Sequence, residues 1–222
     1  MAVEVKVCGL TRAADAALAT ALGAAYLGFI FAPSPRRLTV DAAAQLLATL
    51  GTADEATARP RRVGVFAGAG VGEIAAAVHR LGLDIVQLHG AEDARLVAAL
   101  RDTVPSALWS VVHVGEEGID RAQLEWATRG DGILLDAKVD GMLGGTGRAF
   151  DWERERAVVA PLRAGRSIIL AGGLTAENVA RAIAVFSPDI VDVSSGVEAS
   201  PGCKDPARLR AFVHAVHGVG AA

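Results

Sequence analysis

The sequence predicts a (β/α)8 barrel, in which eight parallel strands and their helices form a single domain. Short apolar runs alternate with Ala- and Leu-rich helical patterns along the whole chain. Eight such pairs fit within 222 residues, somewhat fewer than the ~250 typical of this class. No linker or low-complexity tract divides the chain, and a hydrophobic content of 52% is enough for one large core.

We expect a strand wherever a short apolar run precedes a helical pattern. In order, the strands are residues 3–8, 26–31, 62–66, 85–89, 108–114, 132–136, 167–171 and 190–194. The helices follow at residues 12–22, 40–49, 72–81, 92–101, 120–127, 152–160, 176–186 and 205–217. The domain would span residues 1–222, with a frayed tail at 219–222. A doubly wound open sheet is the main alternative, but Cys8-Gly9-Leu10-Thr11-Arg12 lacks the glycine fingerprint which that fold needs after its first strand.

Composition narrows the possible partners and the compartment. A net charge of −3 with both signs interspersed argues against nucleic-acid binding. Residues 16–32 carry no charge, and their length is near the lower limit of ~17 residues for a membrane span. A membrane span is therefore an alternative interpretation of this stretch. Gly23 divides this stretch into a helical and a strand-like half, so we expect no membrane span. Two cysteines make no disulfide framework and no signal peptide is evident, which predicts a cytoplasmic protein.

Several strands place polar residues on one face, because alternate residues of a strand point to opposite sides. Near the strand ends these residues are Glu4, Lys6, Cys8, Gln87, His89, Asp136, Asp192 and Ser194. In the first strand, the opposite face consists of valines. This pattern favours a barrel lumen that opens onto a pocket, with the helices covering the apolar face.

Cys8 and Asp136 each close a strand, at the end where α/β barrels keep their chemistry. A thiol and a carboxyl group at one rim can act as a base and an acid on one substrate. Taken singly, each residue has a structural interpretation, as a small buried cysteine or a helix-capping aspartate.

The last two strands end in small residues, Gly172-Gly173 after residues 167–171 and Ser194-Ser195-Gly196 after residues 190–194. Many barrels bind a phosphate in the loops after strands seven and eight. Glycines let backbone N–H groups approach the phosphate oxygens, and a helix N-terminus adds a favourable dipole. One Gly-Gly turn could simply be a tight connection, but two such loops predict a phosphorylated substrate.

A series of motifs in chain order resembles the phosphoribosylanthranilate isomerases of the tryptophan pathway. They are Lys6-Val7-Cys8-Gly9-Leu10-Thr11, Gly28-Phe29-Ile30-Phe31 with Pro35-Arg36, Val63-Gly64-Val65-Phe66, Val86-Gln87-Leu88-His89-Gly90, Leu134-Leu135-Asp136, Gly144-Gly145-Thr146-Gly147 with Phe150-Asp151-Trp152, Leu170-Ala171-Gly172-Gly173-Leu174, and Asp192-Val193-Ser194-Ser195-Gly196-Val197-Glu198 followed by Pro201-Gly202 and Lys204-Asp205. The resemblance extends over the whole chain.

The resemblance implies an Amadori rearrangement of N-(5-phosphoribosyl)anthranilate to 1-(2-carboxyphenylamino)-1-deoxyribulose 5-phosphate. In the family's pattern, Asp136 is the general acid that protonates the furanose oxygen, and Cys8 is the general base that removes the proton from C2. Such an acid needs a raised pKa, and a thiol base needs a pKa lowered from ~8.5. Lys6 shares a strand face with Cys8, so we expect it to supply part of the positive field.

Other substrate contacts follow from the same resemblance. Arg36 matches the family's arginine near the anthranilate, and a guanidinium suits a carboxylate. The stretch between Phe31 and Arg36 is one residue short of the usual pattern, so Arg37 is the alternative. Gln87 and His89 would line the pocket, although an isolated histidine at a strand end is often structural. Asp192, Gly172, Gly173, Ser194, Ser195 and Gly196 complete the predicted contacts.

The remaining candidates have weaker signals. No two histidines have metal-ligand spacing, so neither a metal nor a cofactor is expected, and His79, His113, His214 and His217 are expected to be unrelated to the pocket. The glycine-rich loop at 137–148 is expected to close as a lid, with Trp152 packing at its base. Cys203 is interpreted as incidental.

Two other kinds of function are alternatives to the isomerase. One is another ribose-phosphate barrel: an epimerase, an indole-forming synthase or an isomerase with a broader substrate range. Epimerases of this kind need paired aspartates and a metal with histidine ligands, which the chain lacks. An indole-forming synthase needs lysines at strand ends, but Lys6 is the only lysine in a predicted strand and it precedes the strand's end. A catalytically silent phosphate-binding barrel is the other, but it would not be expected to retain both Cys8 and Asp136. We expect an isomerase of a small phosphorylated molecule, acting as a monomer or homodimer.

Overall fold

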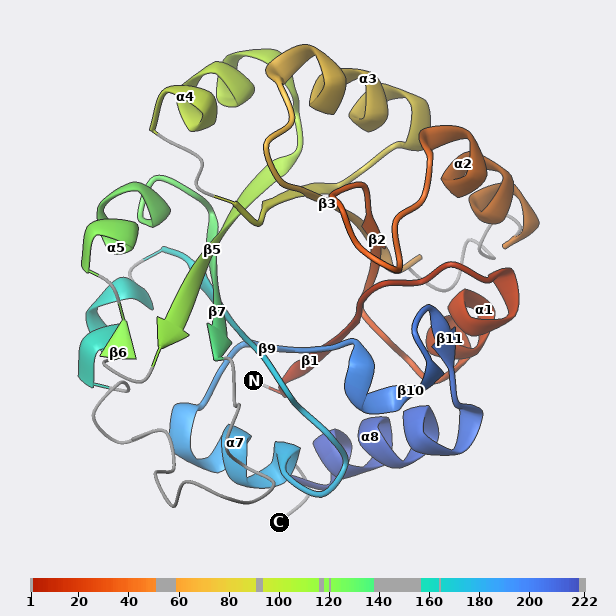
Figure 1. The fold of residues 1–222 in the computed structure, drawn as a ribbon. Coiled ribbons are helices and arrows are strands. Elements are labelled where there is room, and N and C mark those ends of the chain that lie inside the picture. Colours follow the sequence, from red (N-terminus) through yellow and green to blue (C-terminus); the bar gives the residue numbers. More distant parts are fainter. Residues whose placement is uncertain are drawn as a thin grey trace.

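The computed structural model describes residues 2–50, 59–90, 94–115, 118–119, 121–137, 157–163 and 165–219. Within these residues, eight parallel strands form a closed ring with helices outside it (Figure 1). The strands are β1 (Glu4–Val7), β2 (Tyr26–Ile30), β3 (Arg61–Phe66), β4 (Ile85–Leu88), β5 (Ala107–Gly115), β7 (Gly132–Ala137), β8 (Ser167–Ala171) and β9 (Ile190–Val193). The predicted barrel is therefore confirmed, and each predicted strand lies within one residue of the observed bounds.

Pairing between the first and last strands closes the ring. β1 pairs with β2 on one side and with β9 on the other, from Glu4 opposite Ile190 to Val7 opposite Val193. The pairing of β4 with β5 joins the two halves of the sheet. This closure excludes the doubly wound alternative, because an open sheet has two unpaired edge strands.

The outer layer consists of helices, and side-chain hydrogen bonds determine where two of them begin. They are α1 (Ala13–Ala21), α2 (Val40–Thr49), α3 (Val71–Leu81), α4 (Ala94–Thr103), α5 (Arg121–Ala127), α7 (Val179–Phe186) and α8 (Pro206–Val219). The Thr39 hydroxyl accepts the Ala42 N–H at the start of α2, as an N-cap does. The start of α7 lies three residues after the predicted one, because Asn178 instead holds a turn by bonding Thr175 and Gly173.

Some predicted features lie outside the described residues. These are most of the loop predicted as a lid, Trp152 and the first part of the helix predicted at 152–160. The described part of that helix is helical at 157–159 and continues as the 3-10 turn η1 (Ala160–Arg163).

Two short strand pairs were not predicted. β6 (Gly118–Ile119) pairs antiparallel with the end of β5. β10 (Glu198–Ser200) and β11 (Cys203–Lys204) form a small antiparallel hairpin after β9, outside the ring and beside α1 and α8 (Figure 1).

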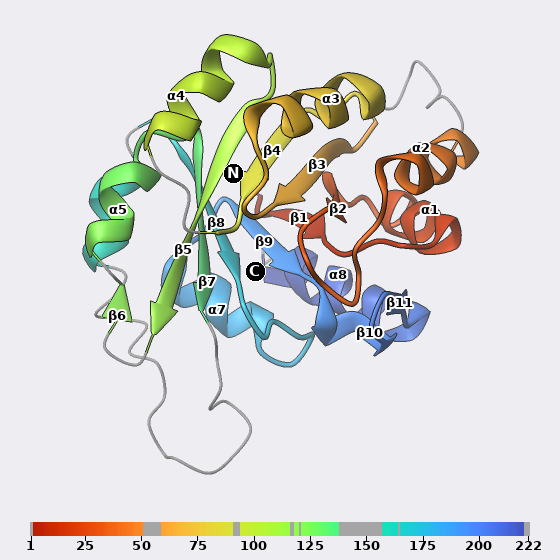
Figure 2. The same ribbon diagram turned by 45° about the horizontal axis from the view of Figure 1, so that its top comes forward.

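Apolar side chains fill both sides of the strand ring. Valines and leucines of the strands pack outward against the helices, as the strand alternation predicted for β1. The lower lumen holds a second apolar cluster, in which the rings of Tyr26 and Trp109 lie 5.2 Å apart. Figure 2 shows the helices wrapped around the tilted strands. In the described part of the chain, no helix combines the length and apolarity needed to cross a membrane.

Candidate active site

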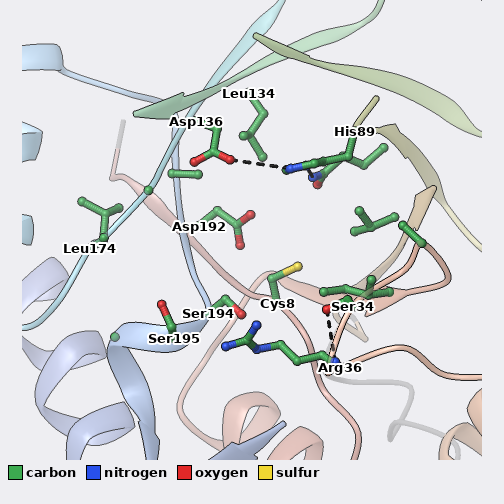
Figure 3. A pocket seen from close by; sticks show the side chains of 18 of the residues that line it. Cys8, Ser34, Arg36, His89, Leu134, Asp136, Leu174, Asp192, Ser194 and Ser195 are labelled. Carbon is green, nitrogen blue, oxygen red and sulfur yellow. Dashed lines mark hydrogen bonds and ion pairs between the residues drawn. The ribbon is translucent and has the colours of Figure 1, made fainter. Parts of the chain in front are cut away.

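A cavity of about 550 Å³ opens at the C-terminal ends of the barrel strands. It contains every residue for which a catalytic or substrate contact was predicted (Figure 3). Its lining is Cys8, Ile30, Ala32, Pro33, Ser34, Arg36, Val65, Gln87, His89, Leu134, Asp136, Ala171, Gly172, Gly173, Leu174, Asp192, Ser194, Ser195 and Gly196. The sulfur of Cys8 and the carboxyl group of Asp136 therefore face one space.

Cys8 directly follows β1 and continues its ladder, because its N–H donates to the Val193 carbonyl at 2.8 Å. Its side chain is buried. One step deeper in the lumen, Lys6 is opposite Asp192 in the register, and its Nζ lies 2.5 Å from Asp192 Oδ2. Lys6 and Cys8 share a strand face, as predicted, so a buried ion pair lies beneath the sulfur.

Burial dominates the titration of the Cys8 thiol and raises its pKa. Lys6 and Lys204 favour the thiolate, but Asp192 opposes it, and the pKa stays above its ordinary value. The prediction of a lowered pKa for Cys8 was wrong for the ligand-free protein, because the sulfur is shielded from water and Lys6 is paired with a carboxylate. Burial also opposes the charge on Lys6, but Asp192 and Cys8 outweigh it and raise the pKa of the lysine.

Asp136 lies on β7 with two histidines beside its carboxyl group. His89 Nε2 is 3.6 Å and His113 Nδ1 is 3.9 Å from Asp136 Oδ2. The expectation that His113 is unrelated to the pocket residues was wrong: β5 and β7 pair in parallel, with His113 opposite Asp136. Only that register, which the sequence does not specify, brings the two side chains together.

Despite Asp136, burial, His113 and Lys6 together hold the pKa of His89 below its ordinary value, and this favours the neutral ring. The Gln87 amide nitrogen lies 3.4 Å from His89 Nδ1. When Nδ1 accepts from this amide, the ring proton is on Nε2 and faces Asp136. The pair can therefore orient the carboxyl group without adding a charge.

The two predicted phosphate loops meet at their backbones. A Cβ atom on Gly196 would lie 1.9 Å from the Leu174 carbonyl oxygen, so only glycine allows this approach. Gly172 and Gly173 precede Leu174, and Ser194 and Ser195 precede Gly196, which brings both small-residue segments to one side of the cavity.

Of the two neighbouring arginines, Arg36 lines the cavity and Arg37 is exposed. The Arg36 guanidinium forms two hydrogen bonds with Glu198, which also pairs with Lys204 Nζ at 2.9 Å. Burial raises the pKa of Glu198, but these two cations outweigh it and lower the pKa. Sequence reasoning missed Glu198 and Lys204 as site residues, although both lie in the quoted motifs, and Lys204 is a second lysine in a strand.

Three buried polar atoms at the cavity have no hydrogen-bond partner among the described residues: Gln87 Oε1, Asp192 Oδ1 and Ser194 Oγ. Buried polar groups are normally paired, so the missing partners of these three atoms mark this part of the cavity wall as unusual. The described residues contain no cluster of three or more His, Cys, Asp or Glu side chains arranged around a possible metal.

Comparisons with known proteins agree on one family. Residues 5–215 match the family model described as N-(5'phosphoribosyl)anthranilate (PRA) isomerase. A protein of that name from Paracoccus denitrificans is 42% identical over 223 residues, covering 96% of both chains.

Two solved structures are also similar. Monomers of the dimeric phosphoribosylanthranilate isomerase from Thermotoga maritima are 34% identical with a TM-score of 0.76. A phosphoribosylanthranilate isomerase in complex with reduced 1-(o-carboxyphenylamino)-1-deoxyribulose 5-phosphate is 33% identical with a TM-score of 0.77. Each match covers 97% of this chain and 99% of the other.

Proposed function

The chain belongs to the N-(5'-phosphoribosyl)anthranilate isomerase family, and we propose that its catalysis uses Asp136 as the general acid and Cys8 as the general base. The enzyme is an isomerase of tryptophan biosynthesis that acts on phosphoribosylanthranilate. One observation carries the proposal of roles: a thiol and a carboxyl group line the same cavity at the rim of the barrel.

In the first step, protonated Asp136 donates its proton to the furanose oxygen. The bond between that oxygen and C1 breaks, the ring opens, and the nitrogen lone pair forms a cationic Schiff base with C1. His89 and His113 flank the carboxyl group and keep it directed into the cavity. Protonation of a leaving oxygen by a positioned acid typically contributes ~10²–10⁴-fold to the rate.

In the second step, the Cys8 thiolate removes the proton from C2. The C2–H electrons form the C1–C2 double bond of an enolamine, and the Schiff base nitrogen takes up the electrons of its former double bond. Tautomerisation then gives the C2 ketone. The pKa of Cys8 is raised in the free protein, but the cationic Schiff base formed in the first step favours the thiolate by charge attraction.

We assign each polar group of the substrate to a different part of the cavity. The phosphate is assigned to the loops with Gly172, Gly173, Ser195 and Gly196, where backbone N–H groups can approach it. The ribose is assigned to the polar side chains of Gln87, Asp192 and Ser194, which line the cavity. Arg36 is assigned to the anthranilate carboxylate.

Because Cys8 acts only as a free thiol, we also propose that the enzyme works in a reducing compartment such as the cytoplasm.

Cys8→Ser and Asp136→Asn test these roles. Each substitution keeps the side chain's size but removes its proton-transfer function, so we expect turnover to fall at least ~10²-fold. The measurement is a fluorescence assay of phosphoribosylanthranilate consumption. Cys203→Ser is the control, since that cysteine lies outside the cavity lining, and its turnover should stay near that of the parent enzyme. Near-normal turnover in Cys8→Ser or Asp136→Asn would refute that residue's role.

A further inference from the structure

The Arg36 side chain is held on two sides before any ligand arrives. Its Nε and Nη2 donate to Glu198 Oε1 and Oε2 at 2.8 and 2.6 Å, a two-bond contact between planar groups. Its stem lies over Gly9, where a Cβ atom would be 2.5 Å from Arg36 Cδ and where φ is +70°. Glycine at this position therefore leaves the space that the arginine occupies.

Glu198 is itself fixed by the hairpin of β10 and β11. Lys204 lies opposite Glu198 in the register, and both side chains are almost completely buried. Lys204 Nζ donates to Glu198 Oε1 at 2.9 Å and to the Ser194 carbonyl at 3.0 Å. The Gly202 N–H adds a third contact with Glu198 at 3.2 Å. The hairpin thus ties the carboxylate to the backbone of the β9 loop.

This contact leaves one edge of the guanidinium available. Arginine has five N–H donors, and Glu198 takes one from Nε and one from Nη2. The described residues provide no acceptor for Nη1. Figure 3 shows the guanidinium of Arg36 below Cys8 and next to Ser194. Arg36 and Lys204 together carry one positive charge more than Glu198 neutralises, so the cluster can accept an anionic group.

We infer that Glu198 is a positioning residue, which orients Arg36 so that its free edge binds the carboxylate of the anthranilate ring. The inference rests on the proposed function in assigning that carboxylate to Arg36. It deepens the proposal, because it makes the β10–β11 hairpin a determinant of specificity for ribosylamines whose aromatic ring carries an ortho carboxylate.

Binding of two matched probes to the Glu198→Gln variant tests the inference. One is reduced 1-(2-carboxyphenylamino)-1-deoxyribulose 5-phosphate, and the other is the same compound without the carboxyl group. By calorimetry, we expect the Kd of the carboxylated probe to rise about 10- to 100-fold, the range for a lost hydrogen bond to a charged group. The Kd of the second probe should stay close to that of the parent protein.

Further variants separate positioning from general destabilisation. Arg36→Gln should show the same probe selectivity, and Arg36→Gln/Glu198→Gln should match Arg36→Gln alone, because the two residues act through one contact. Glu198→Met/Lys204→Met removes the buried pair with apolar residues of similar size, so it supplies a folded test if Glu198→Gln does not fold. Asp84→Asn is the control, since Asp84 also holds an arginine by two bonds but lies outside the cavity lining.

Equal weakening of both probes in Glu198→Gln, or no weakening of either, would overturn the inference. The probes are not turned over, so this result is independent of whether Cys8 and Asp136 transfer protons. If the proposed catalytic roles were wrong, Cys8→Ser or Asp136→Asn would turn over normally. Glu198→Gln would still weaken binding of the carboxylated probe alone.

Discussion

Cys8 combines a buried sulfur with charges that partly cancel around it. Lys6 is paired with Asp192 and Lys204 with Glu198, so neither lysine offers its full charge to the sulfur. Burial then decides the balance and raises the pKa of the free thiol. In this environment the thiol is mainly protonated near neutral pH, which protects it from side reactions until the substrate provides a positive charge.

The titration of this thiol can be followed apart from catalysis, because an alkylating reagent reacts with the thiolate and not with the thiol. Because the pKa of Cys8 is raised, we expect its alkylation rate in the free Cys203→Ser enzyme to keep rising with pH beyond ~8.5, the ordinary cysteine value. Reaction with iodoacetamide across a pH series measures this rate. A plateau in the alkylation rate that begins below pH 7 would contradict the raised pKa.

Lys6→Met tests the contribution of the buried cation. Lys6 favours the thiolate, so its removal should shift the pH profile of Cys8 alkylation to higher pH and lower turnover at neutral pH. Arg101→Met is the control, because it removes an arginine that is paired with Asp131 outside the cavity lining. A pH profile of Lys6→Met that overlays the parent profile would end this explanation.

The sequence predicted those residues of the candidate site that lie at the ends of strands. Cys8 and Asp136 close strands, and barrel topology alone brings strand ends to one rim. Glu198 was missed because its role depends on contacts with Arg36 and Lys204, which lie in a distant loop and in a hairpin. His113 was missed because its neighbour is set by strand register, which periodicity does not determine.

At the level of elements, one device recurs at the N-terminal ends of three strands. Asp84, Asp131 and Asp189 directly precede β4, β7 and β9. Each carboxylate accepts a backbone N–H from the preceding parallel strand, those of Arg62, Leu108 and Ile168, at 2.7, 2.8 and 2.7 Å. Each also binds an arginine, namely Arg59, Arg101 and Arg163. The device ties neighbouring strands together at the end of the barrel opposite the cavity.

Asp131→Ala should lower the free energy of unfolding by about 1–3 kcal/mol, because it leaves the Leu108 N–H without its acceptor. Asp131→Asn keeps a carbonyl acceptor and should lose less. Urea unfolding measures both, and kcat should stay unchanged because Asp131 lies outside the cavity lining. Equal stability of Asp131→Ala and the parent protein would show that the device is dispensable.

Strand positions were predictable because most of these buried parallel strands are continuous apolar runs, while β1 alternates polar and apolar residues. Both patterns differ from the period of an amphipathic helix. The β10–β11 hairpin was not, since Glu198–Ser200 and Cys203–Lys204 are short, polar and without alternation. The start of α7 was misplaced because Asn178 prefers a side-chain-bonded turn to a helical first turn. In the hairpin and at the start of α7, polar side chains therefore determine the local structure, and the spacing of apolar residues does not predict it.

The whole barrel separates stability from chemistry along its axis. The lower lumen is filled by an apolar cluster that includes Tyr26, Trp109 and Ile169. The upper lumen holds the buried pair Lys6–Asp192 and the open cavity. Burying a charged pair costs solvation free energy, which a large closed apolar core can offset. The fold can therefore maintain perturbed ionisable groups at one rim without losing its packing.

Stability of the whole molecule should fall in acid because its carboxylates are stabilised as anions. Burial raises the pKa of Asp84, but hydrogen bonds from Arg59 and the Arg62 backbone outweigh it and lower the pKa. Glu198 and Asp205 also have lowered pKa values. The unfolded chain, with ordinary values of ~3.9–4.3, then binds more protons, so unfolding free energy is lost as pH falls from about 5 through these lowered values. Urea unfolding between pH 7 and 3 measures this loss. Asp84→Asn should start less stable at pH 7 but lose less on acidification, and a curve parallel to that of the parent protein would contradict the role of this carboxylate.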